Sequence, residues 1–147
     1  MITEQEYWMG RDVKYADLFT DEIKVNGLET VVRVNSLLLL ADDDCVPYGA
    51  VASGWRPQPL NDGTTNAAIY SKHITARACD IRDGPNREFA RWCLRHLDYL
   101  RDAEVWMEDP RWTPTWVHLQ TVPPGSGKRV FIPSSSPPSA APLPGQT

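Results

Sequence analysis

The chain has 147 residues and a formal net charge of −4, and hydrophobic residues make up 41% of it, including six tryptophans. This length suits one domain with a single core, and this share of apolar residues predicts a folded chain rather than a disordered one. The sequence has no block of lysine or arginine, so we expect no nucleic-acid or other polyanionic partner.

Two helices are predicted in the first part of the chain. Thr3 and Glu6 have the spacing of a capping box, so a short helix should begin there and stop near Gly10. A long core helix should begin at Thr20, because two acidic residues follow in its first turn and favour the helix dipole. Its predicted inward side consists of Leu28, Val31, Val32, Leu38 and Leu39.

The middle of the chain is predicted to hold loops and two strands. The long helix should fray at residues 41–44, and a loop then leads into a short strand that Pro57 closes. Residues 58–66 are rich in turn formers and are predicted to form an exposed loop. A second strand is predicted at residues 76–82.

The second half predicts one helix followed by strands. The helix should cover residues 85–102, and Phe89, Cys93, Leu97 and Leu100 should point inward. His96, in the last turn of this helix, is expected to complement the helix dipole and to meet solvent. Strands are predicted at residues 104–108 and 115–120, so the fold class is α+β. We expect residues 1–133 to form one domain and residues 134–147 to form a flexible, Pro- and Ser-rich tail.

The sequence predicts no targeting segment and no disulfide or zinc-thiolate site. The longest apolar run, residues 37–41, is too short to span a bilayer, and the first ten residues lack the basic start and apolar core of a signal peptide. We therefore expect a protein made in the cytoplasm, with no membrane partner. Cys45, Cys79 and Cys93 have no CxxC spacing and are predicted to be small buried residues rather than disulfide or zinc-thiolate ligands.

One constellation suggests metal chemistry. His73 and Asp80 are seven residues apart, which on a helix would hold them roughly 10 Å from each other, too far to bind one ion. A turn between them, followed by a strand, would let an imidazole and a carboxylate converge, and both are good zinc ligands. His118 is the best third ligand, because period-two alternation in "TWVHLQ" places it on one face with Trp116 and Gln120.

Further residues could complete a catalytic site. Water activated by a metal needs a base, and Glu108 ends the predicted strand before that of His118, so a hairpin could bring the two together. Asp109 is the second candidate, although a residue that begins a Pro-containing turn is more often a turn former. Arg56 could bind a substrate carboxylate or stabilise an oxyanion.

Four tryptophans lie near these candidates, and each could line a substrate groove or belong to the core. For Trp106 we favour the core. Trp112 and Trp116 flank the predicted site, and for them a groove wall and a core position are equally expected. For Trp55 both interpretations remain open.

The segments that carry these residues resemble a known family. "SKHITARACDI" resembles the S-x-H-x-x-G-x-A-x-D signature of the M15 zinc peptidases, which include D-alanyl-D-alanine carboxypeptidases, D-Ala-D-Ala dipeptidases and phage L-alanyl-D-glutamate endolysins. "WVHLQ" resembles the late W-x-H strand of that family, and "SGWRP" resembles its upstream S-G-W/Y-R segment. The resemblance covers residues 51–133 and implies a small antiparallel sheet that carries a zinc site and packs against helices, as in hedgehog-like domains.

The resemblance also assigns roles to individual residues. It implies one zinc ion, and the residues that match its ligands are His73, Asp80 and His118. Those that match substrate contacts are Arg56, Ser71 and Trp116, and Glu108 matches the base of smaller, phage-associated members. Ala76 stands where the signature has glycine, and Thr115 stands where many members carry the base.

Two functions follow from the resemblance. The first is a zinc metallopeptidase that cuts peptide bonds of bacterial peptidoglycan, acting at the cell wall after release or as a virion or prophage component. The second is a wall-binding or structural phage protein that keeps the fold without cleaving. Thr115 and the Pro-rich tail motivate the second function.

Overall fold

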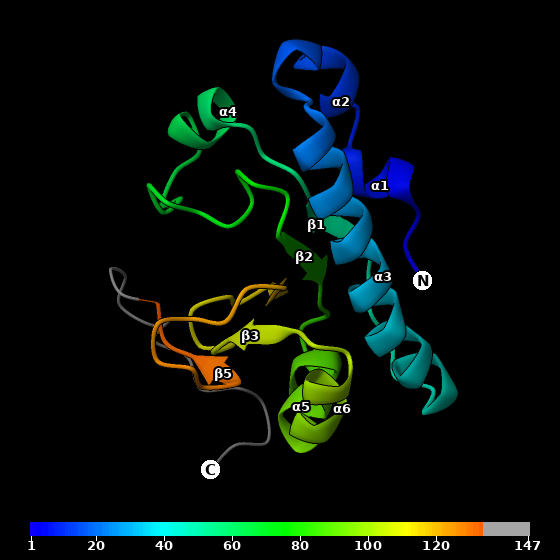
Figure 1. Ribbon diagram of the computed structural model, residues 1–147. Helices are drawn as coiled ribbons and strands as arrows, with labels where there is room; N and C mark the ends of the chain where they lie inside the picture. Colours follow the sequence, from blue (N-terminus) through cyan, green and yellow to red (C-terminus); the bar gives the residue numbers. More distant parts are fainter. Residues whose placement is uncertain (134–147) are drawn as a thin grey trace.

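The structure is a computed structural model that describes residues 1–133, so the predicted tail at residues 134–147 lies outside the described residues. Helices and a small sheet together confirm the α+β class (Figure 1). In chain order the elements are α1 (Glu4–Trp8), α2 (Arg11–Lys14), the 3-10 helix η1 (Ala16–Leu18), α3 (Asp21–Asp43), β1 (Val51–Ser53), α4 (Gln58–Asp62), β2 (Ala78–Arg82), α5 (Glu88–Arg95), α6 (Leu97–Asp102), β3 (Trp106–Glu108), β4 (Trp116–Gln120) and β5 (Val130–Phe131).

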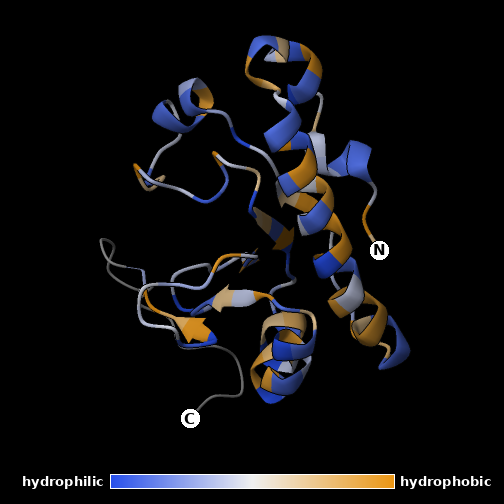
Figure 2. Cartoon of the chain, viewed as in Figure 1, coloured by the Kyte–Doolittle hydropathy of each residue, from blue (hydrophilic) through white to orange (hydrophobic). Residues whose placement is uncertain are grey.

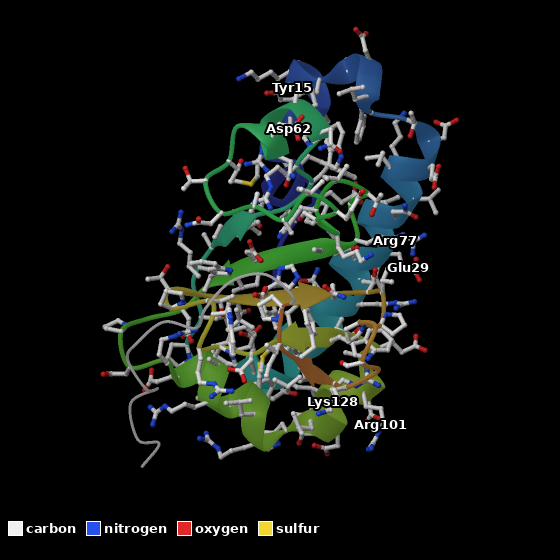
Figure 3. The ribbon with its side chains drawn as sticks, turned by 90° about the vertical axis from the view of Figure 1, so that its left-hand side faces the viewer. Tyr15, Glu29, Asp62, Arg77, Arg101 and Lys128 are labelled. Atoms are coloured by element: carbon white, nitrogen blue, oxygen red, sulfur yellow. The ribbon has the colours of Figure 1, made fainter. Side chains whose placement is uncertain are left out.

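The five strands form one sheet in the order β1-β2-β4-β3-β5, which Figure 3 shows from top to bottom. The first three pairings are antiparallel, but β5 pairs with β3 in parallel. The expectation of a purely antiparallel sheet is therefore wrong at this edge, because the two-residue strand β5 was not recognised in the sequence. β4 occupies the centre of the sheet and is hydrogen-bonded to β2 on one side and to β3 on the other.

The predicted helix starts near the N-terminus are confirmed. The Thr3 hydroxyl accepts a hydrogen bond from the backbone N–H of Glu6, and the Glu6 carboxylate accepts one from the N–H of Thr3. At the start of α3, the Thr20 hydroxyl accepts from the N–H of Ile23. Both caps satisfy donors that have no partner inside the helix.

The buried side of α3 differs from the predicted one. Val31 and Leu38 are buried as expected, whereas Leu28, Val32 and Leu39 are exposed. Figure 2 shows that hydrophobic residues occur on more than one side of this helix, so hydropathy alone does not identify the side that packs. The buried residues are Asn26, Gly27, Thr30, Val31, Val34, Leu37, Leu38 and Ala41.

Small and polar residues on the buried side of α3 have specific partners. A Cβ added at Gly27 would lie 2.1 Å from the Trp8 ring, so only glycine lets Trp8 pack against the helix. Asn26 and Thr30 donate to the carbonyl oxygens of Thr75 and Ala76 at 3.0 and 2.8 Å. These two hydrogen bonds fix the turn that leads into β2.

Two other predicted boundaries are corrected. Residues 58–66 were expected to form a loop, but Gln58–Asp62 forms the helix α4, which begins after Pro57 and buries Asn61. The predicted helix at 85–102 is interrupted at His96, where φ is −127° and ψ is 54°, so α5 ends there and α6 begins. The break exposes Leu97, and the half-buried His96, which directly follows the C-terminus of α5, stacks its ring on Tyr99 at 4.6 Å.

Two of the three cysteines, Cys79 and Cys93, are buried as predicted, whereas Cys45 is exposed. Cys45 follows the end of α3 with a left-handed φ of 56°. Its N–H donates to the Asp42 carbonyl, and the next N–H along the chain donates to the Ala41 carbonyl. This hydrogen-bond pair is the Schellman motif, whose left-handed position favours glycine.

The two faces of the sheet have different chemistry. One face carries the apolar side chains of Cys79, Ile81, Met107, Val117 and Leu119, all fully buried in the core with α3, α5 and α6. Because side chains alternate along a strand, Asp80 and His118 lie on the opposite face. No helix among residues 1–133 has the length and apolarity needed to cross a membrane.

Candidate metal centre

The structure brings together the three side chains that the sequence suggested as metal ligands. Asp80 on β2 is the cross-strand neighbour of His118 on β4, and His73 comes from the turn before β2. Asp80 Oδ1 lies 2.8 Å from His118 Nδ1, and Asp80 Oδ2 lies 3.2 Å from His73 Nε2. One ligand atom from each residue lies within 4.8 Å of the others, so the group could hold a metal ion.

The chain between His73 and Asp80 makes the tight turn that the spacing required. The N–H of Ala76 donates to the His73 carbonyl, and that of Arg77 donates to the Lys72 carbonyl. Ala76 has a φ of 58°, a left-handed conformation that costs roughly 1–2 kcal/mol for residues other than glycine. The position where the family signature has glycine is therefore one where glycine would relieve strain. The hydrogen bond from Thr30 holds Ala76 in this conformation.

His73 is oriented by a backbone carbonyl. Its Nδ1 lies 2.8 Å from the carbonyl oxygen of Gly54, and because that oxygen can only accept, Nδ1 carries the proton and Nε2 points at Asp80. Gly54 is needed for a close approach, since a Cβ there would lie 1.9 Å from the carbonyl oxygen of Tyr7. Gly54 stands in the "SGWRP" segment, but no sequence pattern indicated this role.

His118 is oriented in the same way by a side-chain amide. Its Nε2 lies 3.1 Å from Gln120 Oε1, and Gln120 Nε2 donates to the Val122 carbonyl at 2.7 Å. The second contact fixes the amide so that an acceptor faces the ring, and His118 Nε2 must therefore donate. Gln120 was predicted on the His118 face, but its orienting role was missed.

Both histidines thus direct an unprotonated nitrogen at the Asp80 carboxylate when the rings are neutral. Two lone pairs facing an anion repel it, so the arrangement requires either extra protons on the rings or a cation among these atoms. Metal-binding histidines typically donate their other N–H to a carbonyl or carboxylate oxygen, as both do here. These residues therefore fit a divalent metal ion.

The electrostatics of the group favour an ionised Asp80. Burial would raise the pKa of Asp80, but the charges and hydrogen bonds of His73 and His118 outweigh it and hold this pKa well below its ordinary value. Burial would lower the pKa of His118, but the hydrogen bond and charge of Asp80 outweigh it and raise this pKa to about 9. The Asp80 carboxylate is therefore ionised at neutral pH.

Glu108 lies on the same face of the sheet as the metal candidates. Trp106 is the cross-strand neighbour of Gln120, and alternation then places Glu108 on the side of His118. Burial raises the pKa of Glu108; the charge of His118 opposes this shift and the charge of Asp80 adds to it. Among residues 1–133, the groups that shift the pKa of Glu108 act through burial and charge, and none of them donates a hydrogen bond to its carboxylate.

Asp109, the second candidate base, is held in an ion pair. Arg111 donates to its carboxylate through Nε and Nη2, with a shortest distance of 2.8 Å. Burial would raise the pKa of Asp109, but the hydrogen bonds and charge of Arg111 outweigh it and lower this pKa. These contacts make Asp109 a turn residue rather than a base.

Arg56 and Ser71 support the turn that carries His73. Arg56 donates from Nε to Asn61 Oδ1 at 3.0 Å and from Nη2 to Ser71 Oγ at 3.3 Å. Ser71 Oγ also accepts from the N–H of His73, and the N–H of Arg56 donates to the His73 carbonyl. Of the guanidinium nitrogens, Nη1 makes no hydrogen bond to the described residues and could reach a substrate. The predicted substrate contacts stay predictions.

The tryptophans near the site occupy different environments. Trp116 is half-buried at the start of β4, and its carbonyl accepts from Arg87 Nη2 at 2.8 Å. Trp106 is half-buried on the site face, with the Arg129 guanidinium 4.3 Å from its ring centre, so the expected core position is wrong. Trp112 lies in the loop between β3 and β4.

Comparison with known proteins adds no assignment. No protein-family model, no curated protein and no solved structure matched the chain. The likeness to the M15 peptidases therefore rests on the three short segments around Arg56, His73 and His118. Membership of that family stays a prediction.

Proposed function

We propose that the chain is a zinc-dependent peptidase that hydrolyses peptide bonds of bacterial peptidoglycan, with His73, Asp80 and His118 as zinc ligands. The observation that carries the proposal is the pair of oriented histidines, each presenting its inner nitrogen to one buried carboxylate. The resemblance of the three motif segments is the support for the substrate class.

The donor set favours zinc over harder cations. Two imidazoles and one carboxylate are typical of catalytic zinc sites, which take three protein ligands and leave a position for water. Magnesium and calcium prefer sites made of oxygen ligands. Iron(II) can use the same donors, so metal analysis of the purified protein is part of the test.

Each neighbouring residue has a role in the proposed reaction. Bound zinc supplies a Lewis acid and lowers the pKa of water. Glu108 accepts the proton of the attacking water and hands it to the leaving amine, and its raised pKa brings it nearer to neutral pH, where a base is most effective. Arg56 Nη1 contacts the substrate carboxylate or the developing oxyanion, and Trp116 forms part of the substrate wall.

The alternative is a wall-binding or structural phage protein that keeps the metal without cleaving. Thr115 favours this alternative, because many members of the resembled family carry their base at that position. The two functions differ in the consequence of changing Glu108. A base is needed for turnover but not for binding a metal.

The experiment is a digestion of purified peptidoglycan by the zinc-loaded protein, with released fragments identified by mass spectrometry. Wild type and the control variant Glu88→Gln, which changes an exposed glutamate on α5, should release the same new peptide termini. Glu108→Gln should lose activity by about 10²–10⁴-fold while retaining one zinc ion per chain. Zinc-loaded wild type that releases no fragments would favour the alternative, and a His118→Ala variant that keeps its zinc would refute the site.

A further inference from the structure

Two large apolar side chains stand at the corner of a tight turn close to the candidate site. The N–H of Ser71 donates to the Ala68 carbonyl at 3.2 Å, so Ile69 and Tyr70 are the central residues of a β-turn. Their side chains are 75% and 88% exposed. Turn corners favour Gly, Pro, Asn, Asp and Ser, and neither residue gains from burial here. The fold itself gives no reason for this pair, a conflict that is typical of functional positions.

The turn is held at its first residue by the buried amide of Asn61 and at its last residue by Arg56. Asn61 Nδ2 donates to the Ala68 carbonyl at 3.0 Å, and its Oδ1 accepts from Arg56 Nε at 3.0 Å. Arg56 continues to Ser71 Oγ, which also accepts from the N–H of His73. The hydrogen bonds that fix this turn therefore continue to the backbone of His73. The position of the exposed pair relative to the metal candidates is set by hydrogen bonds.

The turn lies away from the main helix. In Figure 1 the loop that follows α4 lies to the left of β2, whereas α3 lies to its right. The loop belongs to the side of the sheet that carries His73. A polymer bound at the metal candidates could extend across it.

We infer that Ile69 and Tyr70 form a preformed contact with the sugar strand of peptidoglycan, an inference that rests on the proposed function. The flat face of a tyrosine ring suits the C–H face of a pyranose ring, and the isoleucine adds apolar contact beside it. An uncharged partner fits the acidic chain, with Asp62 exposed on the neighbouring helix, better than an anionic lipid surface. A turn that is already ordered loses little conformational entropy on binding.

The first test measures binding without cleavage. Zinc-loaded Glu108→Gln protein is co-sedimented with purified peptidoglycan, with and without the changes Ile69→Ser and Tyr70→Ser. The matched control carries Val13→Ser and Val25→Ser, which remove apolar side chains that are 79% and 64% exposed on α2 and α3. The turn variant should bind about tenfold more weakly, whereas the control should bind unchanged. Equal binding by the turn variant and its parent would overturn the inference.

The second test separates a sugar contact from a peptide contact. In the otherwise wild-type chain, Tyr70→Ser should lower kcat/KM about tenfold on intact peptidoglycan and leave it unchanged on soluble wall peptides without sugar. Tyr70→Phe should restore activity on the polymer, because it keeps the ring face. An equal loss on both substrates would overturn the sugar contact. A Tyr70→Ser variant that keeps its binding to peptidoglycan but loses the co-sedimentation of wild type with phosphatidylcholine vesicles would also overturn the sugar contact. That result would indicate a lipid partner.

The outcomes keep this inference distinct from the proposed function. A wild type that cuts nothing, together with peptidoglycan binding that depends on Ile69 and Tyr70, would refute the peptidase and support the sugar contact. A wild type that cuts peptidoglycan, with binding and turnover independent of both residues, would support the peptidase and refute the sugar contact.

Discussion

Zinc binding should strengthen as the pH rises, because His118 must lose a proton before its Nδ1 can bind an ion. The pKa of His118 is raised to about 9, since the interaction with Asp80 outweighs the effect of burial. The ring is therefore almost fully protonated at pH 7, and removing the proton costs about 3 kcal/mol. Zinc affinity at pH 7 should be about 100-fold lower than its limit above pH 9. Asp80 stays ionised throughout and should release no proton.

Isothermal titration calorimetry with a competing chelator measures this dependence. Titrations in two buffers with different ionisation enthalpies should show about one proton released per zinc at pH 7, and affinity should rise about tenfold per pH unit between pH 6.5 and 8.5. His96→Ala is the control, since His96 stacks on Tyr99 on the helical side of the molecule and should leave both results unchanged. A constant affinity over this range, or no proton release, would refute the reasoning.

Three further predictions concern single positions. Gly54→Ala should lower the free energy of unfolding by about 1–3 kcal/mol in urea titrations, because the added Cβ would meet the Tyr7 carbonyl; unchanged stability would contradict that close approach. Gln120→Leu should weaken zinc binding about 10–100-fold with an unchanged circular dichroism spectrum, and equal affinity would show that the amide does not orient His118. Cys45→Gly should raise the melting temperature and stabilise the protein by about 0.5–1 kcal/mol, because glycine adopts the left-handed φ without strain; a lower melting temperature would count against this account.

Local sequence signals predicted the parts of the fold that depend on neighbouring residues. The capping residues Thr3 and Thr20 mark helix starts because their partners lie three residues away. The alternation around His118 identified the face of β4, since side-chain direction in a strand follows from sequence position alone. The same alternation put Gln120 on the right face, but its role depends on a contact with the Val122 carbonyl that no pattern reveals.

The sequence predictions were wrong where contacts with residues far away in the sequence determine the local structure. The inward side of α3 contains Gly27 because Trp8 packs there, and it contains Thr30 because the turn at Ala76 needs a hydrogen-bond donor. Counting apolar residues alone therefore places Leu28 on the inward side of the helix, although its side chain is exposed. The break at His96 is of the same kind, since the sequence there holds neither proline nor glycine to announce it.

The central position of β4 has a consequence for folding during synthesis. The strand that joins β2 to β3 leaves the ribosome after both of them, so neither the sheet nor the metal candidates can assemble earlier. Asp80 and His118 are separated by 38 residues, which take about 2–8 s to translate at typical rates. During that interval β2 has an unpaired edge, and a nascent chain without β4 offers zinc only part of its ligand set. Metal loading should therefore follow translation of this domain rather than guide it.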